Sequence, residues 1–471
     1  MSSASPRLSR IVTQPGLPYF KTEDGVPWTP IGHNDAVTWP DFAALFRRRD
    51  PDAVERHLVR LRDHGVTCIR LMLEYCHGEH RYLERPAGRF VPNMVQLWDD
   101  LFAMMERVGM RVLLTPYDTF FMWVRWKHHP YNRANGGPCG RRDAWLTSPE
   151  MRDAIKARLA FASDRWGGSS ALFAWDVWNE IHPAHGGNDP ANVAPFLDDI
   201  APWLRAREIA RRGYANLQTV SVFGPELINH PALVEPVFRH PGLDFANTHL
   251  YEAGTIDAPR DTVAPALAVA RLMAAAVGAA GLRPVFDSEH GPIHSFKDRK
   301  KTLAEPFDDE YFRHIQWAHL ASGGAGGGMR WPNRHPHVLT DGMRNAQRVL
   351  SLFLPLIDWT RFRRENLSGT TACDDPGVAA IGCGDDRQAV AWLVRQDGAR
   401  RGKVLVERAD APAAMLSVTG LADGDYAVTA FDTRSGKATR LADVRSRGGQ
   451  AHTAVGPIAS DRAYAISALP R

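Results

Sequence analysis

The chain has 471 residues, of which 44% are hydrophobic and 23% are charged, and its formal net charge is +4. These values are close to the average for globular proteins, and the length exceeds that of one ordinary domain. No run of about 18 consecutive apolar residues occurs and the basic runs are isolated, so neither a membrane span nor a nucleic-acid-binding surface is expected.

The N-terminal segment and the cysteines bear on the compartment. Residues 1–14 contain Arg7 and Arg10 but no apolar segment after them, so no secretory signal is expected in the sequence as given. We therefore expect a cytoplasmic protein, or a secreted one whose leader is absent from this chain. Five cysteines without a CxxC pair favour reduced thiols over a disulfide framework or a zinc ribbon. The oligomeric state stays open.

From Trp28 to about Leu356, short apolar segments alternate with longer helical patterns, which is typical of repeated βα units. Asp50-Pro51 and Ser148-Pro149 each combine a capping residue with proline, which marks the start of a helix. Eight βα pairs predict an α/β fold with a closed (β/α)8 TIM barrel over residues 1–366. The predicted strands are 28–32, 67–73, 111–115, 172–178, 218–222, 245–248, 284–288 and 325–331.

After residue 366 the pattern changes to short alternating segments. Turn signals such as Asp397-Gly398 and Asp423-Gly424 separate them. This pattern predicts a C-terminal antiparallel β-sandwich over residues 367–471. Because no clear aromatic platform stands out there, a structural role is favoured over a binding role.

Two carboxylic acids end apolar strands of the predicted barrel. Glu180 follows the fourth strand and Glu289 follows the seventh. Active sites of such barrels lie at the carboxyl ends of the strands. A pair of acids placed there suits the cleavage of glycosidic bonds, in which one acid protonates the leaving oxygen and the other attacks the sugar carbon. Other strand ends supply polar or aromatic groups: Arg70, Tyr117, Asp118, Asn179, His249, Tyr251 and Trp331.

This pattern resembles the clan A retaining glycoside hydrolases, and most of all glycoside hydrolase family 5, from the first strand to the eighth. The resemblance implies that Glu180 is the acid/base and Glu289 the nucleophile. It also implies substrate-binding or orienting roles for Arg70, Asn179, His249, Tyr251 and Trp331. Where many family members have a histidine after the third strand, this chain has Tyr117-Asp118. The sugar contact expected from these two residues therefore departs from the family pattern.

The chemistry sets requirements of its own. A retaining mechanism needs carboxyl groups about 5 to 5.5 Å apart, one ionised and one protonated. We expect Arg70 and Tyr251 to lower the pKa of Glu289, and the negative neighbour to keep Glu180 protonated. Asn179 is expected to donate to the sugar 2-hydroxyl, and Trp331 to offer an apolar face to the sugar ring.

Loops after the third and fourth strands carry further aromatic and histidine side chains. Trp123, Trp126 and His182 are predicted to contact outer sugars of the substrate. A metal bound by His77 and His80, or by His182 and His185, is an alternative interpretation. These pairs lack the HExxH helix of a zinc site, so neither a metal nor another cofactor is expected.

The sequence therefore predicts a retaining glycosidase that cleaves β-glycosidic bonds of a carbohydrate substrate. A mannan- or glucan-like oligo- or polysaccharide is the expected substrate, and a double displacement with two Glu residues is the expected route. A transglycosylase and a non-catalytic carbohydrate-binding protein on a degenerate barrel are alternatives. A barrel enzyme of unrelated chemistry, such as an aldolase, is disfavoured because no predicted strand ends in Lys.

Overall fold

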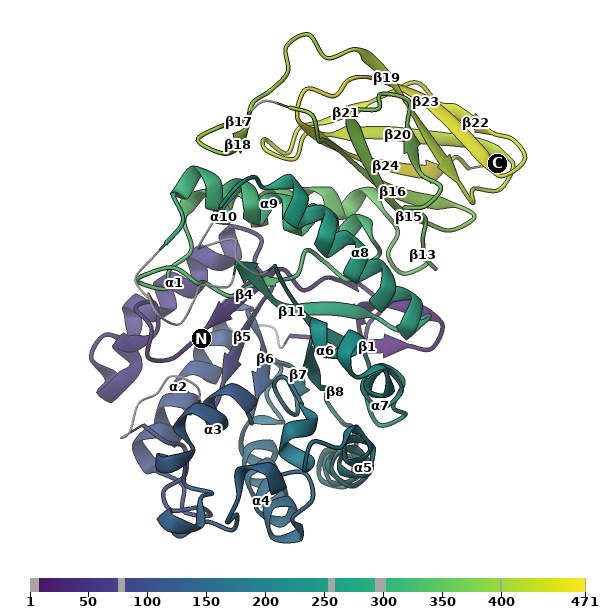
Figure 1. Cartoon of the computed structure of the whole chain (residues 1–471). Coiled ribbons are helices and arrows are strands. Elements are labelled where there is room, and N and C mark those ends of the chain that lie inside the picture. The colour runs from purple at the N-terminus through teal and green to yellow at the C-terminus, as the bar shows by residue number, and fades with distance from the viewer. Residues whose placement is uncertain (1–7, 75–80, 253–258, 293–301, 399, 471) are drawn as a thin grey trace, which may run out of the picture.

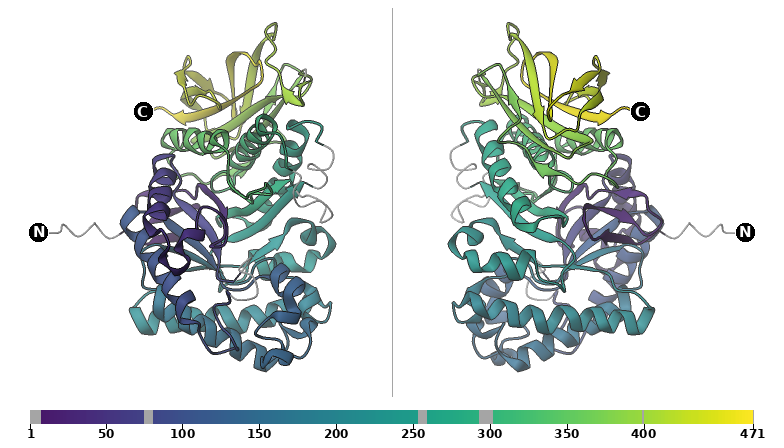
Figure 2. Two further views of the ribbon diagram at one scale, coloured as in Figure 1. Left: turned by 90° about the vertical axis from the view of Figure 1, so that its left-hand side faces the viewer. Right: turned by 90° about the vertical axis from the view of Figure 1, so that its right-hand side faces the viewer.

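The computed structural model describes residues 8–74, 81–252, 259–292, 302–398 and 400–470. A barrel of parallel strands wrapped in helices forms one part of the molecule. A β-sandwich packs against helices on one side of this barrel (Figures 1 and 2). The predicted combination of a (β/α)8 barrel with a C-terminal antiparallel sandwich is confirmed.

The barrel is one sheet of nine strand segments in the order β8-β7-β6-β5-β4-β12-β11-β10-β9. β8 and β9 are halves of one strand that is interrupted at Val220. Because β8 pairs with β7 and β9 pairs with β10, this split strand closes the barrel. The segments are β4 (Gly32–Asp35), β5 (Cys68–Met72), β6 (Arg111–Thr115), β7 (Leu172–Asp176), β8 (Leu217–Thr219), β9 (Ser221–Phe223), β10 (Ala246–Glu252), β11 (Val285–Pro292) and β12 (Met329–Arg330).

Helices surround the barrel as the sequence predicts. The side chain of Asp50 accepts a hydrogen bond from Ala53 N, and that of Ser148 accepts one from Met151 N, so both predicted helix starts are capped. The longer helices are α1 (Pro51–Asp63), α2 (Pro92–Val108), α4 (Pro149–Trp166), α5 (Val193–Arg212), α8 (Val263–Ala280), α9 (Glu305–Ala321) and α10 (Asp341–Phe353). The shorter ones are α3 (Thr119–Arg125), α6 (Gly224–Asn229) and α7 (Val234–Phe238).

Helix α8 is apolar apart from Arg271. Among the described residues it is the one helix long and apolar enough to cross a membrane. Val269, Met273 and Val277 are buried, and the helix packs against β10 and α9. Its composition is therefore accounted for by its place in the wall of the barrel.

The first predicted strand is displaced. It lies at Gly32–Asp35 instead of 28–32, because the His, Asn and Asp side chains of β4 are buried polar groups that interrupt the apolar pattern. Trp28 belongs instead to a small antiparallel sheet of β1 (Ile11–Gln14), β2 (Leu17–Thr22) and β3 (Pro27–Trp28). Phe20 of this sheet meets Phe173 and Phe245 edge-on, each at 5.1 Å between ring centroids. The small sheet thus covers the amino-terminal end of the barrel.

The last barrel strand is shorter than predicted. β12 spans Met329–Arg330, whereas the prediction was 325–331. Gly326 and Gly328 have φ values of +89° and +73°, which turn the backbone out of the extended conformation. A Cβ on Gly326 would lie 2.4 Å from the carbonyl oxygen of Pro30, so glycine also permits a close approach of two segments.

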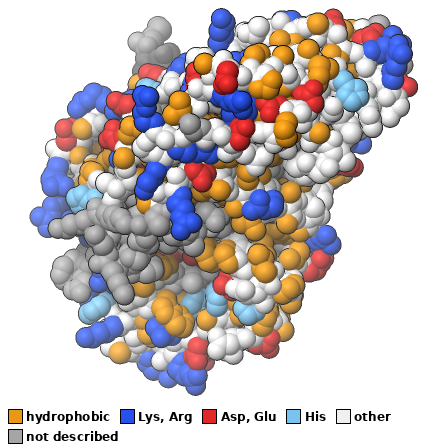
Figure 3. Space-filling model, turned by 45° about the horizontal axis from the view of Figure 1, so that its top comes forward, with side chains coloured by type: hydrophobic (Ala, Val, Ile, Leu, Met, Phe, Trp, Pro, Cys, Tyr) orange, Lys and Arg blue, Asp and Glu red, His pale blue; other side chains and the backbone are white. Residues whose placement is uncertain are grey.

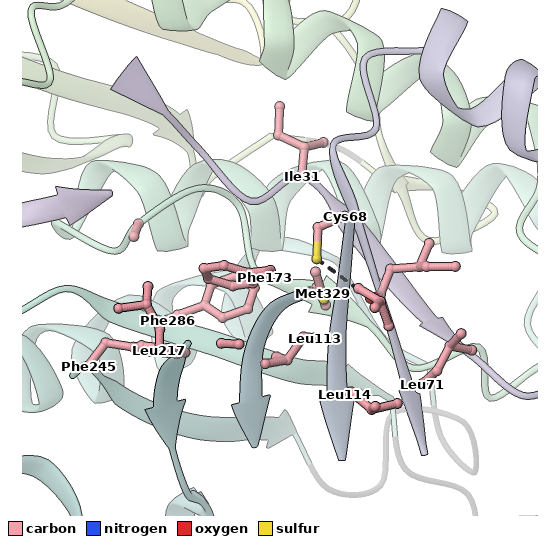
Figure 4. Packing of buried hydrophobic residues seen from close by; sticks show 14 of the residues in the cluster. Ile31, Cys68, Leu71, Leu113, Leu114, Phe173, Leu217, Phe245, Phe286 and Met329 are labelled. Atoms are coloured by element: carbon pink, nitrogen blue, oxygen red, sulfur yellow. Dashed lines mark hydrogen bonds between the residues drawn. The ribbon is translucent and has the colours of Figure 1, made fainter. Parts of the chain in front are cut away.

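Apolar side chains on both faces of the barrel strands are buried. Figure 4 shows some of this packing, and the residues labelled in it are all nearly inaccessible to solvent. Adjacent residues such as Leu113 and Leu114 point to opposite faces, so the strands pack both into the barrel and against the surrounding helices. The labelled residues are Ile31, Cys68, Leu71, Leu113, Leu114, Phe173, Leu217, Phe245, Phe286 and Met329.

The sandwich has a large sheet in the order β13-β15-β16-β24-β20-β21, with β22 paired to β20, and a small sheet β14-β19-β23. Its first strand, β13, begins at Glu365 and pairs with β15, just before the boundary predicted at 366/367. The strands are β13 (Glu365–Asn366), β14 (Ala372–Cys373), β15 (Val378–Gly384), β16 (Gln388–Arg395), β17 (Arg400–Arg401), β18 (Val404–Leu405), β19 (Ala413–Thr419), β20 (Gly424–Phe431), β21 (Ala438–Arg440), β22 (Val444–Ser446), β23 (Gln450–Pro457) and β24 (Asp461–Ala468).

The large sheet is buried on both faces. Along β16, Val390 and Trp392 belong to the core shared with the barrel helices, whereas Ala391 and Leu393 belong to the core beneath the small sheet. Such alternation is the two-residue period of a strand. On the face shown in Figure 3, described acidic and basic side chains are interspersed over the exterior of the molecule.

Candidate active site

Glu180 and Glu289 come together at the carboxyl end of the barrel. Glu289 lies within β11, and Glu180 follows β7 with a φ of +50°, a left-handed conformation that is uncommon outside glycine. One carboxylate oxygen of each residue and Nδ1 of His249 all lie within 4.8 Å of one another. The two acids therefore face the same small gap.

Arg70 of β5 lies beneath the two acids and bonds several side chains of the site. Its side chain is completely buried. Nη1 donates to Glu289 Oε2 at 2.7 Å and to Asn34 Oδ1 at 2.9 Å. Nη2 donates to Asp176 Oδ2 at 2.7 Å and also to Asn179 Oδ1. One guanidinium group thus orients four residues that come from three barrel strands, β4, β7 and β11, or directly follow them.

Two residues of β10 contact the two acids. The hydroxyl group of Tyr251 donates to Glu289 Oε1 at 2.5 Å. His249 Nδ1 lies 2.8 Å from Glu180 Oε1, and its Nε2 lies 3.0 Å from Ser288 Oγ. The pairing of β10 with β11 shifts register at this point, so that Thr248 pairs with Asp287 and His249 with Glu289. This bulge leaves Ser288 to bond the imidazole and lets Glu289 reach the gap.

The two acids differ in the pKa that their surroundings give them. Burial raises the pKa of Glu180 to about 7; Arg70 acts against this shift, and the Asp176 and Glu226 carboxylates add to it. Burial also raises the pKa of Glu289, although His249, Arg70 and Tyr251 oppose it. The expectation that the pKa of Glu289 would fall is wrong in its net direction, because the loss of water outweighs its partners. Burial lowers the pKa of His249 to about 4, so this imidazole is neutral at pH 7.

Asn179 is fixed by its neighbours. Its Oδ1 accepts from Arg70, and its Nδ2 donates to Asp118 Oδ1 at 2.5 Å. The segments holding Asp118 and Asn179 also form a short parallel bridge. Because an amide nitrogen carries two hydrogens, Nδ2 retains one for a ligand. Asp118 thus lies behind Asn179 and orients it.

Trp331 lies beside Tyr251 in a small cluster at the barrel mouth, together with Ala36, Trp39 and Met72. Its ring meets the edge of Trp39 at 5.1 Å between centroids. Trp39 in turn stacks on His337 at 4.6 Å. These aromatic rings give the Glu289 side of the site an apolar wall. Sequence reasoning missed Trp39 because it placed the first strand too early.

The residues predicted to contact sugars farther from the two acids fall into two groups, one exposed at the rim and one packed against other side chains. Trp123 on α3 is 37% exposed, with the Arg142 guanidinium 3.6 Å above its ring, and His182 lies on the rim 3.3 Å from a carboxylate oxygen of Glu226. Tyr117 and Trp126 have packing partners instead. The hydroxyl of Tyr117 lies 3.0 Å from that of Tyr131 and donates to the carbonyl of Ile155. Trp126 packs against the rings of His129 and Trp145.

Several supporting residues were not predicted from the sequence. Asn34, Asp176, Ser221 and Ser288 each bond a predicted site residue. Asp176 also accepts from the backbone and the hydroxyl group of Ser221. An acid inside an otherwise apolar strand is the signal that could have identified Asp176, since such a group needs a buried partner.

Two groups of described residues come close enough to hold a metal ion: Glu180 with His249 and Glu289, and Asp35 with Asp41 and His57. Each group already has a cationic neighbour, Arg70 in the first and Arg344 in the second, which opposes a further positive charge. The rings of His182 and His185 are 6.2 Å apart. His77 and His80, the other proposed pair, lie outside the described residues.

No protein-family model matches the sequence, and no curated protein shows significant similarity to it. Solved structures do share the fold. A structure named as a glycoside hydrolase is 13% identical, with a TM-score of 0.62 over 98% of this chain and 97% of that chain. A glycoside hydrolase family 5 protein from Bacteroides vulgatus is 12% identical, with a TM-score of 0.60 over 98% and 93%.

A third structure, the endo-β-1,4-mannanase from Thermotoga petrophila, is 13% identical to this chain. Its TM-score is 0.51, over 89% of this chain and 98% of that chain. The first two matches include both the barrel and the sandwich, since they cover nearly all of each chain. This protein therefore shares the fold of these glycoside hydrolases, one of which is named as a family 5 protein.

Proposed function

We propose that this protein is a retaining glycoside hydrolase that cleaves β-glycosidic bonds by double displacement. The observation that carries the proposal is the approach of Glu180 and Glu289, whose nearest carboxylate oxygens lie within 4.8 Å. Retaining enzymes have carboxyl groups about 5 to 5.5 Å apart, whereas inverting enzymes need about 6.5 to 9.5 Å to admit a water molecule. The short gap favours direct attack by one carboxylate.

In the first step, the Glu289 carboxylate attacks the anomeric carbon while Glu180 gives its proton to the glycosidic oxygen. The bond from the anomeric carbon to that oxygen breaks, and a glycosyl ester forms on Glu289. In the second step, Glu180 takes a proton from a water molecule, which attacks the same carbon and releases Glu289. A pKa of about 7 suits Glu180 to both proton transfers near neutral pH.

The neighbouring residues support these roles. Arg70 and Tyr251 donate to separate oxygens of Glu289 and stabilise the carboxylate before attack and as it departs. Neutral His249 contacts Glu180 without adding a full positive charge that would drive off its proton. Asn179, oriented by Arg70 and Asp118, has an N–H group for the sugar 2-hydroxyl.

A mannan- or glucan-like oligo- or polysaccharide is the substrate class that we propose. Trp331 and Trp39 offer apolar rings for the C–H face of a pyranose. One of the structures that share the fold is named as an endo-β-1,4-mannanase, which supports a β-1,4-linked backbone. Transfer of the glycosyl group to a second sugar instead of water uses the same intermediate and would make the protein a transglycosylase.

The proposal is tested by product stereochemistry. The protein is incubated with aryl β-glucosides, aryl β-mannosides and β-1,4-linked oligosaccharides, and the first product is followed by proton NMR. Retention predicts that the β-anomer forms first and then mutarotates. If the α-anomer appears first, the double displacement is wrong. If none of these β-glycosides is turned over but oligosaccharides bind, the protein is a binding protein on a degenerate barrel.

A further inference from the structure

A third carboxylate, Glu226 on α6, lies on the rim of the barrel between two histidines. Its Oε2 is 3.3 Å from Nε2 of His182 and 3.4 Å from Nε2 of His230. Glu226 is 16% exposed at its side chain, and each histidine is 34% exposed. Within the described part of the chain, Oε1 of Glu226 has no hydrogen-bond partner. The cluster is thus open to solvent with an unused acceptor.

The backbone places this cluster directly outward from Glu180. The N–H of Glu180 donates to Ser221 Oγ at 3.0 Å, and that of Ile181 donates to the carbonyl of Ser221 at 2.9 Å. The segment leading to His182 therefore runs along β9, and α6 begins at the residue after that strand. Trp331 and Trp39 instead neighbour Tyr251, the partner of Glu289.

A backbone contact holds the ring of His182. The backbone N–H of Ala184 donates to Nδ1 of His182 at 2.9 Å, so that nitrogen accepts. The other ring nitrogen, Nε2, lies 3.3 Å from Oε2 of Glu226. The backbone thus fixes which edge of the imidazole faces the carboxylate.

We propose that Glu226, His182 and His230 bind the sugar on the leaving-group side of the scissile bond, and that this sugar is uncharged. This inference rests on the proposed function, in which Glu180 protonates the leaving oxygen, so groups next to Glu180 on the rim meet the departing sugar. A carboxylate accepts hydrogen bonds from neighbouring hydroxyl groups of a neutral pyranose. A uronic acid would bring a second negative charge against Glu226 and be disfavoured.

The charge of Glu226 has a second consequence. Glu226 is one of the groups that raise the pKa of Glu180, after burial and together with Asp176. The other charged or titratable groups facing Glu180 are Arg70, His249, Tyr251 and Glu289. Removal of the Glu226 charge should therefore lower the pH at which Glu180 loses its proton.

The test traps the glycosyl-enzyme and measures its release by added sugars. Wild type and Glu226→Ala are inactivated with 2,4-dinitrophenyl 2-deoxy-2-fluoro-β-mannoside or -glucoside, and excess reagent is removed. Recovery of activity is then followed in buffer alone, with methyl β-mannoside or methyl β-glucoside, and with glucuronate. Glu235→Ala is the matched control, because Glu235 is 73% exposed on the neighbouring helix α7.

The expected result is that a neutral methyl glycoside accelerates recovery of wild type in a saturable way and that glucuronate does not. In Glu226→Ala this acceleration, measured as the ratio to the recovery of the same variant in buffer alone, should fall by about tenfold, the value of one hydrogen bond to a charged group. A merely structural role would change recovery with and without the added sugar alike and leave the ratio unchanged. The fall of kcat/KM at high pH should also begin at lower pH in Glu226→Ala, and Glu235→Ala should match wild type.

Equal acceleration of wild type and Glu226→Ala by the neutral glycosides would overturn the inference, as would acceleration of wild type by glucuronate. Both results leave the trapped intermediate, and hence the proposed function, intact. If an enzyme that hydrolyses the parent aryl glycosides is trapped by neither reagent, the proposed function fails and this inference fails with it. If Glu226→Ala does not fold, the same recovery measurement is made on Glu226→Gln. The comparison of neutral methyl glycosides with glucuronate as acceptors for wild type tests the inference without any variant.

Discussion

Glu180 and Glu289 have the same side chain in different surroundings. Glu289 is held by Arg70 and Tyr251, each of which favours its charged form, whereas Glu180 is half-buried near the Asp176 and Glu226 carboxylates, which raise its pKa. Two identical groups can therefore differ in charge at one pH, which a nucleophile and a general acid require. The difference comes from the charged and polar neighbours of each carboxyl group, not from the residues themselves.

Replacement of Glu180 separates its acid role from other effects. For wild type, kcat/KM should fall as pH rises above about 7, because the general acid is then deprotonated. Glu180→Ala should lose activity by about 10²- to 10⁴-fold on substrates with poor leaving groups. On dinitrophenyl glycosides it should keep more activity, lack the fall above pH 7 and regain rate with azide. A persisting fall near pH 7 in this variant would contradict the assignment.

Arg70 supports stability as well as the site. Arg70→Ala leaves Glu289 and Asp176 buried without their cation, so the free energy of unfolding should drop by about 3 to 5 kcal/mol. Denaturant unfolding measures this change. Arg48→Ala is the control, since Arg48 pairs with Asp100 at an exposed position and should change stability little. An equal loss of unfolding free energy in Arg70→Ala and Arg48→Ala would contradict the claim that Arg70 stabilises the buried carboxylates.

At the scale of elements, the sequence predicts those strands whose apolar residues are continuous. The fourth and seventh strands begin with such residues, 172–175 and 284–286, which is why Glu180 and Glu289 could be found from the sequence. β4 could not, because its polar side chains are satisfied by residues distant in the chain, such as Ser288, to whose carbonyl Asn34 donates. Glu226 could not either, because its closeness to Glu180 depends on the irregular segment after β7 lying along β9.

The small N-terminal sheet should stabilise the barrel without taking part in the chemistry. Phe20 is 1% exposed and packs on Phe173 and Phe245 at the end of the barrel opposite the site. Phe20→Ala should cost about 3 to 5 kcal/mol of unfolding free energy. The kcat of the folded variant should stay within about twofold of wild type, since a core change far from the site seldom alters the chemistry. Val26→Ala, at an exposed position of the same segment, should change neither the unfolding free energy nor kcat. A large fall in kcat would show that this sheet also positions the site.

At the scale of the whole molecule, the barrel and the sandwich share one core. Phe431 of β20 packs against Trp317 of α9 and Phe353 of α10, with ring centroids 5.7 and 5.2 Å apart. Arg313 of α9 donates to both oxygens of Asp461 at 2.7 and 2.6 Å. The predicted structural role of the sandwich fits this continuous packing, which the sequence could not reveal because it joins elements far apart in the chain.

The Arg313–Asp461 pair should make stability depend on pH. Burial alone would raise the pKa of Asp461, but Arg313 and His314 hold it well below its ordinary value. A depressed carboxyl pKa gives stability that is present above the unfolded pKa of about 3.8 and lost as pH falls below it. Asp461→Asn should therefore lose about 3 to 5 kcal/mol at pH 7, because Arg313 stays buried without its partner.

Chemical denaturation of wild type and Asp461→Asn at several pH values checks this expectation. The difference between them should shrink as pH falls below about 4. Asp443→Asn, which alters an exposed pair with Arg440, is the control and should show little difference at any pH. A difference in unfolding free energy between wild type and Asp461→Asn that does not change with pH would contradict the electrostatic account of this interface.

The central claim is that two acids across one sugar-sized gap perform a double displacement. It is tested most directly by inactivation with 2-deoxy-2-fluoro-β-glycosides, followed by intact mass and peptide mapping. The expected result is one sugar per protein chain, attached through an ester to Glu289. Attachment to any other residue, or no attachment by an enzyme that turns over the parent glycosides, would contradict the account.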